Sequence, residues 1–144
     1  MKSCLYVFPD RVVICSQSQI QMGMWIATPP FYELTIESSD DYRLVDTLFL
    51  SLQHSKTGLA LPDIKENLKL FYKALRVRTN KELHETGKLY SVTYADNILT
   101  ITPCRNLGYK QGFEPINDED IRITDVNDKN LVAHRLKLAI AVSI

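Results

Sequence analysis

The segment Lys88–Pro103, KLYSVTYADNILTITP, consists of two runs of alternating apolar and polar side chains joined by Asp96-Asn97. A period of two is typical of strands, and Asp and Asn tolerate the positive φ that a tight two-residue turn requires. A register that pairs Ala95 with Ile98 places the apolar side chains of both strands on one face. Because turn and alternation agree, the segment predicts a β-hairpin with one buried face.

Other segments extend the predicted sheet. The runs CLYVF and RVVIC, separated by Pro9-Asp10, predict a hairpin or two short strands, and a hairpin would place Cys4 opposite Cys15. Residues 19–27, with Ile and Met in alternation, predict a further strand with Gly23 as a bulge. The prolines at 29 and 30 are expected to end it, since neither can donate a hydrogen bond to a ladder. Residues 32–36 and 120–126 each predict a short strand.

Three segments have the apolar spacing of helices. Residues 38–56 predict one, with Ser38 or Ser39 as cap and Gly58 suited to a left-handed end. A second begins after Asp63, and residues 129–142 predict a C-terminal helix that docks on the sheet. A short helical turn is expected between Thr79 and Gly87.

These elements define the predicted fold class, which is α+β. We expect a single domain over residues 1–144, with a mainly antiparallel sheet of five to seven strands and three main helices packed on it.

Charge is balanced overall but unevenly distributed along the chain. The formal net charge is zero, which argues against a general nucleic-acid binder. Residues 65–88 carry seven Lys or Arg against three Glu, whereas residues 114–128 carry six Asp or Glu against one Arg. These segments are either two solvated faces or, for the acidic one, a surface that meets a basic partner. The N-terminal apolar run is interrupted too early for an export signal, so we expect a cytoplasmic protein.

The sequence offers little catalytic chemistry. It has no metal-binding spacing of Cys or His, and no cofactor or metal is expected. Its three cysteines are expected to be free thiols, although Cys4 and Cys15 are placed close enough for a disulfide. Cys104 beside Arg105 could act as a nucleophile with His134 and Asp125, but no spacing demands it. We therefore expect a protein that is not an enzyme.

The loop segment Thr102–Pro115, TPCRNLGYKQGFEP, admits several interpretations. Its two glycines and its basic side chains could form an anion-binding nest. However, it matches no known phosphate-binding motif, and a strand rather than a helix is expected to follow, so no helix dipole would assist. The segment could instead be a long exposed turn, or an edge that faces a protein partner.

The run LTITPCRNLGYKQGFEPI resembles a segment of the immunity proteins of bacterial contact-dependent growth inhibition systems, the CdiI type. In that pattern a hairpin ends in I-T-P-x-R-N, a loop containing glycine follows, and G-F-x-P leads into a strand. The matching motif positions, which we expect to shape the fold, are Pro103, Arg105, Asn106, Gly112, Phe113 and Pro115. For Arg105 and Asn106 we favour anchoring of the loop.

The resemblance implies a binding protein that neutralises the C-terminal toxin domain of a large exported effector. Such toxins are commonly nucleases, and a ribonuclease is the implied partner, bound as a 1:1 complex without nucleic acid or membrane. A nuclease cleft is basic, so an acidic binder can be steered to it. The predicted partner-binding residues are Glu114, Asp118, Glu119, Asp120, Tyr109 and Lys110. The alternative function is a small cytosolic domain that binds an anion or a nucleic acid.

Overall fold

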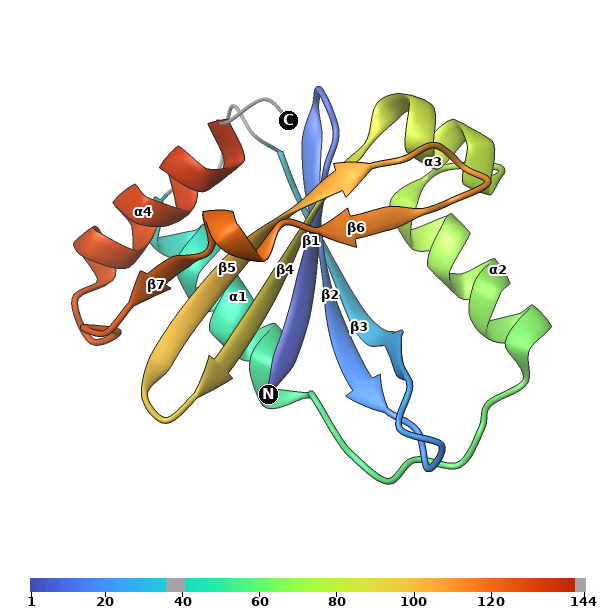
Figure 1. Ribbon diagram of the computed structural model, residues 1–144, viewed down its shortest axis with the longest axis horizontal. Helices are drawn as coiled ribbons and strands as arrows, with labels where there is room; N and C mark the ends of the chain where they lie inside the picture. Colours follow the sequence, from blue (N-terminus) through green and yellow to red (C-terminus); the bar gives the residue numbers. More distant parts are fainter. Residues whose placement is uncertain (36–40, 142–144) are drawn as a thin grey trace.

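The computed structural model describes residues 1–35 and 41–141 (Figure 1). Its strands are β1 (Lys2–Val7), β2 (Arg11–Gln19), β3 (Trp25–Thr35), β4 (Lys88–Ala95), β5 (Ile98–Asn106), β6 (Phe113–Pro115) and β7 (Ile121–Ile123). Its helices are α1 (Asp41–Gln53), α2 (Ile64–Leu75), α3 (Asn80–Thr86) and α4 (Lys129–Ala141), with a 3-10 turn, η1 (Asn117–Glu119). Within the described residues the strands form one seven-stranded sheet in the order β3-β2-β1-β4-β5-β6, with β7 paired to β5. The predicted α+β fold class is confirmed.

The β4–β5 hairpin has the predicted register. Ala95 pairs with Ile98, and Val92 pairs with Ile101. Asp96 and Asn97 both have positive φ, +53° and +61°, as a tight hairpin turn requires. Val92 and Ile101 are fully buried. The short strand predicted at residues 120–126 is also present, as β7.

The predicted N-terminal hairpin is formed by β1 and β2. Cys4 lies opposite Cys15, as the sequence predicts. Both thiols are nevertheless free and buried, and the Cys4 Sγ lies 3.8 Å from the Cys15 carbonyl oxygen. The pair therefore fills the core as two small apolar side chains.

The prediction of one strand over residues 19–27 is wrong, because the chain reverses its direction between Gln19 and Trp25. β2 continues to Gln19, and the Gly23 N–H donates to the Ile20 carbonyl oxygen at 2.8 Å. Gly23 has a φ of +92°, which glycine adopts without steric cost, so it closes a turn rather than forming a bulge. Met22 and Met24 consequently lie at the surface, 76% and 55% exposed.

The two prolines do not end the strand, contrary to expectation. β3 runs through Pro29 and Pro30 into the segment predicted as a separate short strand. The pairing with β2 shifts at this point, from Cys15–Phe31 to Ser16–Thr28, so both prolines lie in a bulge outside the ladder. β3 is an edge strand, where a missing N–H donor costs least.

The helices begin largely where the sequence predicts. The Asp63 carboxylate accepts a hydrogen bond from the Glu66 N–H at the start of α2, and Thr79 caps α3 in the same way. α1 is shorter than predicted, and Gly58 lies too far beyond its end to cap it. Its predicted cap residues 38 and 39, and the predicted last residue of α4, 142, lie outside the described residues.

Helices cover both faces of the sheet. α1 and α4 pack on one face through residues such as Leu48 and Leu136, which are fully buried. α2 and α3 pack on the other through Leu75 and Leu83, in a core that contains Tyr6. Figure 1 shows the two helix pairs on opposite sides of the twisted sheet. A residue on one face is therefore separated from the helices on the other by the sheet itself.

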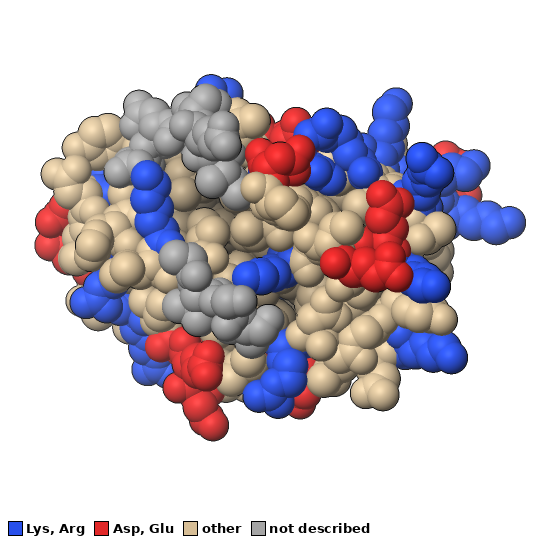
Figure 2. Space-filling model, turned by 90° about the horizontal axis from the view of Figure 1, so that it is seen from above, with Lys and Arg blue, Asp and Glu red and all other residues tan. Residues whose placement is uncertain are grey.

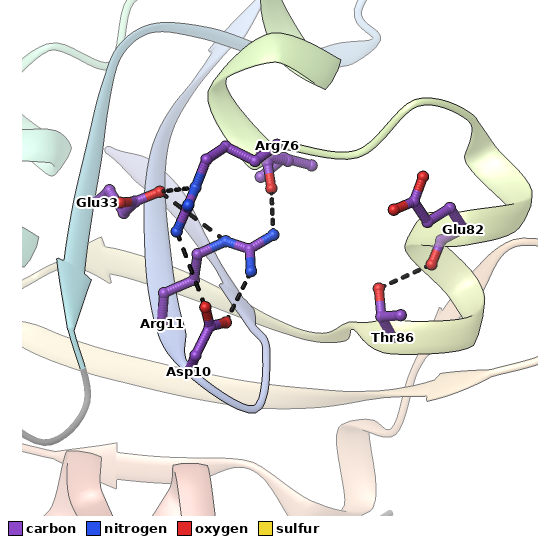
Figure 3. A network of polar contacts seen from close by, with 7 residues as sticks. Asp10, Arg11, Glu33, Arg76, Glu82 and Thr86 are labelled. Carbon is purple, nitrogen blue, oxygen red and sulfur yellow. Dashed lines mark hydrogen bonds and ion pairs between the residues drawn. The ribbon is translucent and has the colours of Figure 1, made fainter.

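The C-terminal end of α2 is held by a polar group that we call the Arg11 cluster: Asp10, Arg11, Glu33 and Arg76 (Figure 3). The Arg11 Nη2 donates to the Leu75 carbonyl oxygen at 2.6 Å, and its Nη1 donates to the Asp10 Oδ1 at 2.7 Å. The Arg76 Nε donates to the Glu33 Oε1 at 2.7 Å. The Arg11 hydrogen bond holds the pKa of the Asp10 carboxyl below its usual value. The cluster joins the β1–β2 turn, β3 and α2.

Candidate partner-binding surface

The loop segment Thr102–Pro115 lies in the hairpin formed by β5 and β6. Gly108 and Gly112 have φ of +91° and +85°. The Leu107 N–H donates to the Gly112 carbonyl oxygen at 2.9 Å, and the Gly112 N–H donates to the Gly108 carbonyl oxygen at 2.8 Å. These backbone N–H groups are satisfied within the loop, so they are not free to bind an anion.

The motif residues lie on and beside this hairpin. Pro103 pairs with Tyr90, and Pro115 pairs with Cys104. The Asn106 Nδ2 donates to the His84 carbonyl oxygen at 2.6 Å, and its Oδ1 accepts from the Gly108 N–H at 2.9 Å. Asn106 thus ties the loop to α3.

Phe113 and Arg105 differ in their surroundings. The Phe113 ring stacks on His84 with centroids 4.3 Å apart, and it contacts the core formed under α2 and α3. The Arg105 side chain is exposed and forms no hydrogen bond or ion pair with any residue in the described ranges, so it does not anchor the loop as expected. Its guanidinium is therefore available to solvent or to a partner.

The predicted acidic residues lie on the second strand of this hairpin and in the 3-10 turn that follows it. Glu114 is on β6, and Asp118 and Glu119 are in η1; all three are exposed. Within the described part of the chain, none of the three forms an ion pair. We call these three residues the acidic segment. Glu114 lies opposite Arg105 in the β5–β6 ladder, whereas the Asp118 and Glu119 carboxylates in η1 project into solvent.

Asp120 is placed differently from its neighbours. Its Oδ1 accepts a hydrogen bond from the Thr102 hydroxyl at 2.6 Å, and its side chain is half-buried. Asp120 therefore ties η1 to β5, and less of its charge faces solvent.

Tyr109 and Lys110 occupy the tip of the loop. Tyr109 is 44% exposed, and the Nζ atoms of Lys110 and Lys81 each lie 5.9 Å from its ring centroid. The Asn80 side chain donates to the Tyr109 carbonyl oxygen at 3.0 Å. Figure 2 shows Lys and Arg side chains gathered at the end of the molecule where α2 and α3 lie. The loop tip thus lies beside two lysine side chains.

Cys104 is poorly placed for nucleophilic chemistry. It is only 7% exposed, and burial raises the pKa of its thiol to about 11. Its neighbour Pro103 pairs with Tyr90, whose side chain belongs to the core under α1 and α4. By strand alternation Cys104 faces the opposite side of the sheet from α4, which carries His134. The sheet therefore separates the thiol from the histidine that would have to activate it.

We expect the Cys104 thiol to react with a disulfide reagent at pH 8 about a hundredfold more slowly in the folded protein than in the unfolded chain. The thiolate is the reactive species, and raising the pKa from 9.0 to about 11 lowers its fraction about that much. Peptide-resolved mass spectrometry after timed labelling separates Cys104 from the other two cysteines. Rapid labelling of native Cys104 at pH 8 would contradict the prediction.

The same pKa shift predicts a pH dependence of stability. The unfolded thiol loses its proton near pH 9 and the folded thiol near pH 11, so the unfolded state binds fewer protons between these values. Stability that is present below pH 9 is therefore lost as the pH rises towards 11. Cys104→Ala should reduce this loss without abolishing it, because burial also raises the pKa of Tyr6.

No group of three or more His, Cys, Asp or Glu side chains in residues 1–35 and 41–141 is arranged to hold a metal ion. No helix in the same ranges is long and apolar enough to cross a membrane.

One feature of the surface was missed by sequence reasoning. Five large apolar side chains are exposed near the β2–β3 turn and the start of α2: Met22, Met24, Leu61, Ile64 and Leu68. A pocket of about 280 Å³ lies among the same segments, lined largely by apolar groups that include Ile26, Leu59 and Pro62. The sequence predicts both methionines within the strand at residues 19–27, and the local pattern does not show that they are exposed.

Both the sequence and the fold were compared with those of known proteins. No known protein family matches the sequence, and neither does any curated protein. Solved structures do match. The fold is similar to that of a protein of unknown function from Neisseria meningitidis, with a TM-score of 0.77 at 17% identity over 96% of this chain and 92% of that one.

A second solved structure bears on the resemblance found in the sequence. The fold is also similar to that of a chain in a CdiA-CT/CdiI toxin and immunity complex from Yersinia pseudotuberculosis. The TM-score is 0.75 at 12% identity, and the match covers 97% of this chain and 95% of that one. At this identity the likeness concerns the fold. The resemblance to the immunity proteins of contact-dependent growth inhibition is confirmed at that level.

Proposed function

We propose that this chain is an immunity protein that binds and neutralises the C-terminal toxin domain of a contact-dependent growth inhibition effector. The observation that carries the proposal is the fold match, over nearly the whole of both chains, to a structure of a toxin and immunity complex. The motif run from Leu99 to Ile116 supports it independently, since that resemblance was found in the sequence alone.

The proposed toxin is a ribonuclease, bound as a 1:1 complex in the cytoplasm. Nuclease active sites carry Lys and Arg because they bind phosphate, so they attract an acidic surface. The acidic segment offers such a surface, with three carboxylates that are exposed and that form no ion pair within the described residues. No catalysis is required of the immunity protein itself, and the buried thiol of Cys104 agrees with this.

The proposal expects a neighbouring gene to encode a large exported protein that ends in a toxin domain, and the test is co-expression of this chain with that domain. We expect cells that express the toxin domain to survive only when this chain is present, and the two to co-purify in a 1:1 ratio. Degradation of cellular RNA by the free toxin domain, and its suppression by this chain, tests the ribonuclease assignment. Failure of the purified chain to bind the toxin domain would overturn the proposal. Binding of RNA by the chain alone, lost at raised salt, would favour the alternative nucleic-acid function.

A further inference from the structure

Five of the exposed large apolar side chains come from two segments of the chain. Met22 and Met24 lie in the β2–β3 turn, Leu61 precedes α2, and Ile64 and Leu68 lie one helical turn apart on α2. We call these five residues the apolar patch. Their exposed fractions range from 44% to 76%. Exposed apolar side chains that gather in one region often mark a binding site.

The patch residues come from the same segments as the lining of the pocket of about 280 Å³, although none of the five lines it. Met24 lies two residues before Ile26, and Leu61 lies between Ala60 and Pro62, and these three neighbours line the pocket. Pockets for cofactors and drug-sized ligands usually measure about 300–1,000 Å³. This one lies at the lower limit of that range and has room for one large apolar side chain.

Three of the polar residues that line the pocket, Ser18, Thr28 and Asn67, are already hydrogen-bonded to the protein, whereas the His54 and Lys56 side chains are exposed. The Ser18 and Thr28 hydroxyls lie 3.0 Å apart, and Ser18 also accepts from the Lys56 N–H at 3.1 Å. The Asn67 side chain donates to the Ala27 carbonyl oxygen at 3.3 Å. A ligand that relied on hydrogen bonds would find few free partners here, whereas an apolar group would lose nothing by entering.

The pocket wall is held in place before any partner binds. The segment 55–59 runs along β2 and its turn, with hydrogen bonds from Gln19 N–H to the Lys56 carbonyl, from Leu59 N–H to the Gln19 carbonyl, and from Gln21 N–H to the Leu59 carbonyl. The Ser55 hydroxyl donates to the Gln17 carbonyl oxygen at 2.6 Å. A wall that is ordered in advance lowers the entropic cost of binding.

The charges around the pocket indicate the chemistry of the occupant. Lys56 lines the pocket, is exposed, and forms no ion pair with any residue in the described ranges. On α2, Lys69 is paired with Glu66, and the exposed Asp63 carboxylate accepts a hydrogen bond from the Glu66 N–H. The unpaired charge that lines the pocket is therefore that of Lys56, which complements a carboxylate on a partner.

We infer that the pocket and the apolar patch receive one aliphatic or aromatic side chain from a loop of the toxin domain, with a carboxylate beside it. This inference rests on the proposed function for the identity of the partner. A buried apolar anchor in a preformed pocket is the usual source of most of the binding energy in an interface. The methionines around it adapt to the shape of the loop.

The site lies far from the acidic segment. β3 is at one edge of the sheet and β6 and β7 are at the other, a separation of about 25 Å at the usual strand spacing. A partner domain of about 100 residues is roughly 30 Å across and can span both. The acidic segment then attracts the toxin domain, and the pocket retains it.

The experiment measures association and dissociation of the toxin domain from three variants by surface plasmon resonance. Leu61→Asp and Ile64→Asp place a charge in the patch, and Leu138→Asp is the matched control, since Leu138 on α4 is 51% exposed and far from the pocket. We expect the two patch variants to dissociate roughly thirtyfold faster or more, because hot-spot residues change affinity by at least that factor. Leu138→Asp should dissociate like the wild type, and all three should keep the wild-type melting temperature.

Each outcome has a separate meaning. If the wild type does not bind the toxin domain, the proposed function and the inference both fall. If the wild type binds and the patch variants dissociate like Leu138→Asp, only the inference falls. Sedimentation of the chain alone tests a second copy as occupant: a wild-type dimer that Leu61→Asp converts to a monomer would overturn the toxin assignment for this site.

Discussion

Arg11→Met is expected to lower the free energy of unfolding by about 3 kcal/mol, through loss of charge-assisted hydrogen bonds at a largely buried group. The Arg11 side chain is only 12% exposed, and its guanidinium carbon lies 4.1 Å from the centroid of the buried Phe8 ring. The Leu75 carbonyl oxygen at the end of α2 would lose the donor that Arg11 supplies. Methionine preserves most of the apolar stem, so the variant isolates the charged head. Urea unfolding monitored by circular dichroism gives the free energy.

Arg76→Met is the matched control. Arg76 contacts the same two carboxylates, Asp10 and Glu33, but its side chain is 55% exposed (Figure 3). Ion pairs in solvent contribute only about 0.2–1 kcal/mol, so this variant should lose less than 1 kcal/mol. Equal losses for both variants would show that the charge balance of the cluster, rather than burial of Arg11, stabilises this end of α2.

Segments whose local signals agree could be predicted from the sequence. In the β4–β5 hairpin, alternation, turn residues and cross-strand pairing all indicated one register, and the structure has it. The caps of α2 and α3 were predictable for the same reason, because a cap side chain and the N–H group that donates to it lie three residues apart.

Segments decided by distant contacts could not be predicted. Alternating Ile and Met side chains at residues 20–26 look alike whether they face a core or solvent. The turn at Gly23 is closed by local hydrogen bonds, and hydrogen bonds of Gln19 and Gln21 to residues 56–59, more than 30 residues away in the sequence, hold its two sides in place. The bulge that accommodates Pro29 and Pro30 likewise depends on the pairing with β2.

The same distinction applies to the candidate site. The exposure of Asp118 and Glu119 followed from their position between a proline and a strand. The half-buried position of Asp120 did not, since its hydrogen-bond partner Thr102 is on another strand, 18 residues away. The apolar patch was missed because it is assembled from the β2–β3 turn and from α2.

Reversing the charges of the acidic segment, Glu114→Lys, Asp118→Lys and Glu119→Lys together, is expected to slow association with the toxin domain by roughly tenfold or more at low salt. Charges on a surface accelerate encounter with an oppositely charged partner, and they act over the Debye length, about 30 Å at 0.01 M salt. All three carboxylates are exposed, so the substitutions should leave the fold intact. Asp120 is kept, because its bond to Thr102 holds η1 in place.

The size and salt dependence of this effect distinguish attraction at a distance from direct contact. The association defect should shrink as salt is raised to 0.15 M, where the Debye length is about 8 Å, and dissociation should change much less. Single reversals should be mild, and Glu119→Lys should slow association more than Glu85→Lys, which makes the same charge change on α3. Stopped-flow mixing at two salt concentrations gives both rates. An unchanged association rate would place the interface elsewhere, on the basic face of α2 around Lys69 and Lys73, and would mean that the toxin domain presents an acidic surface there.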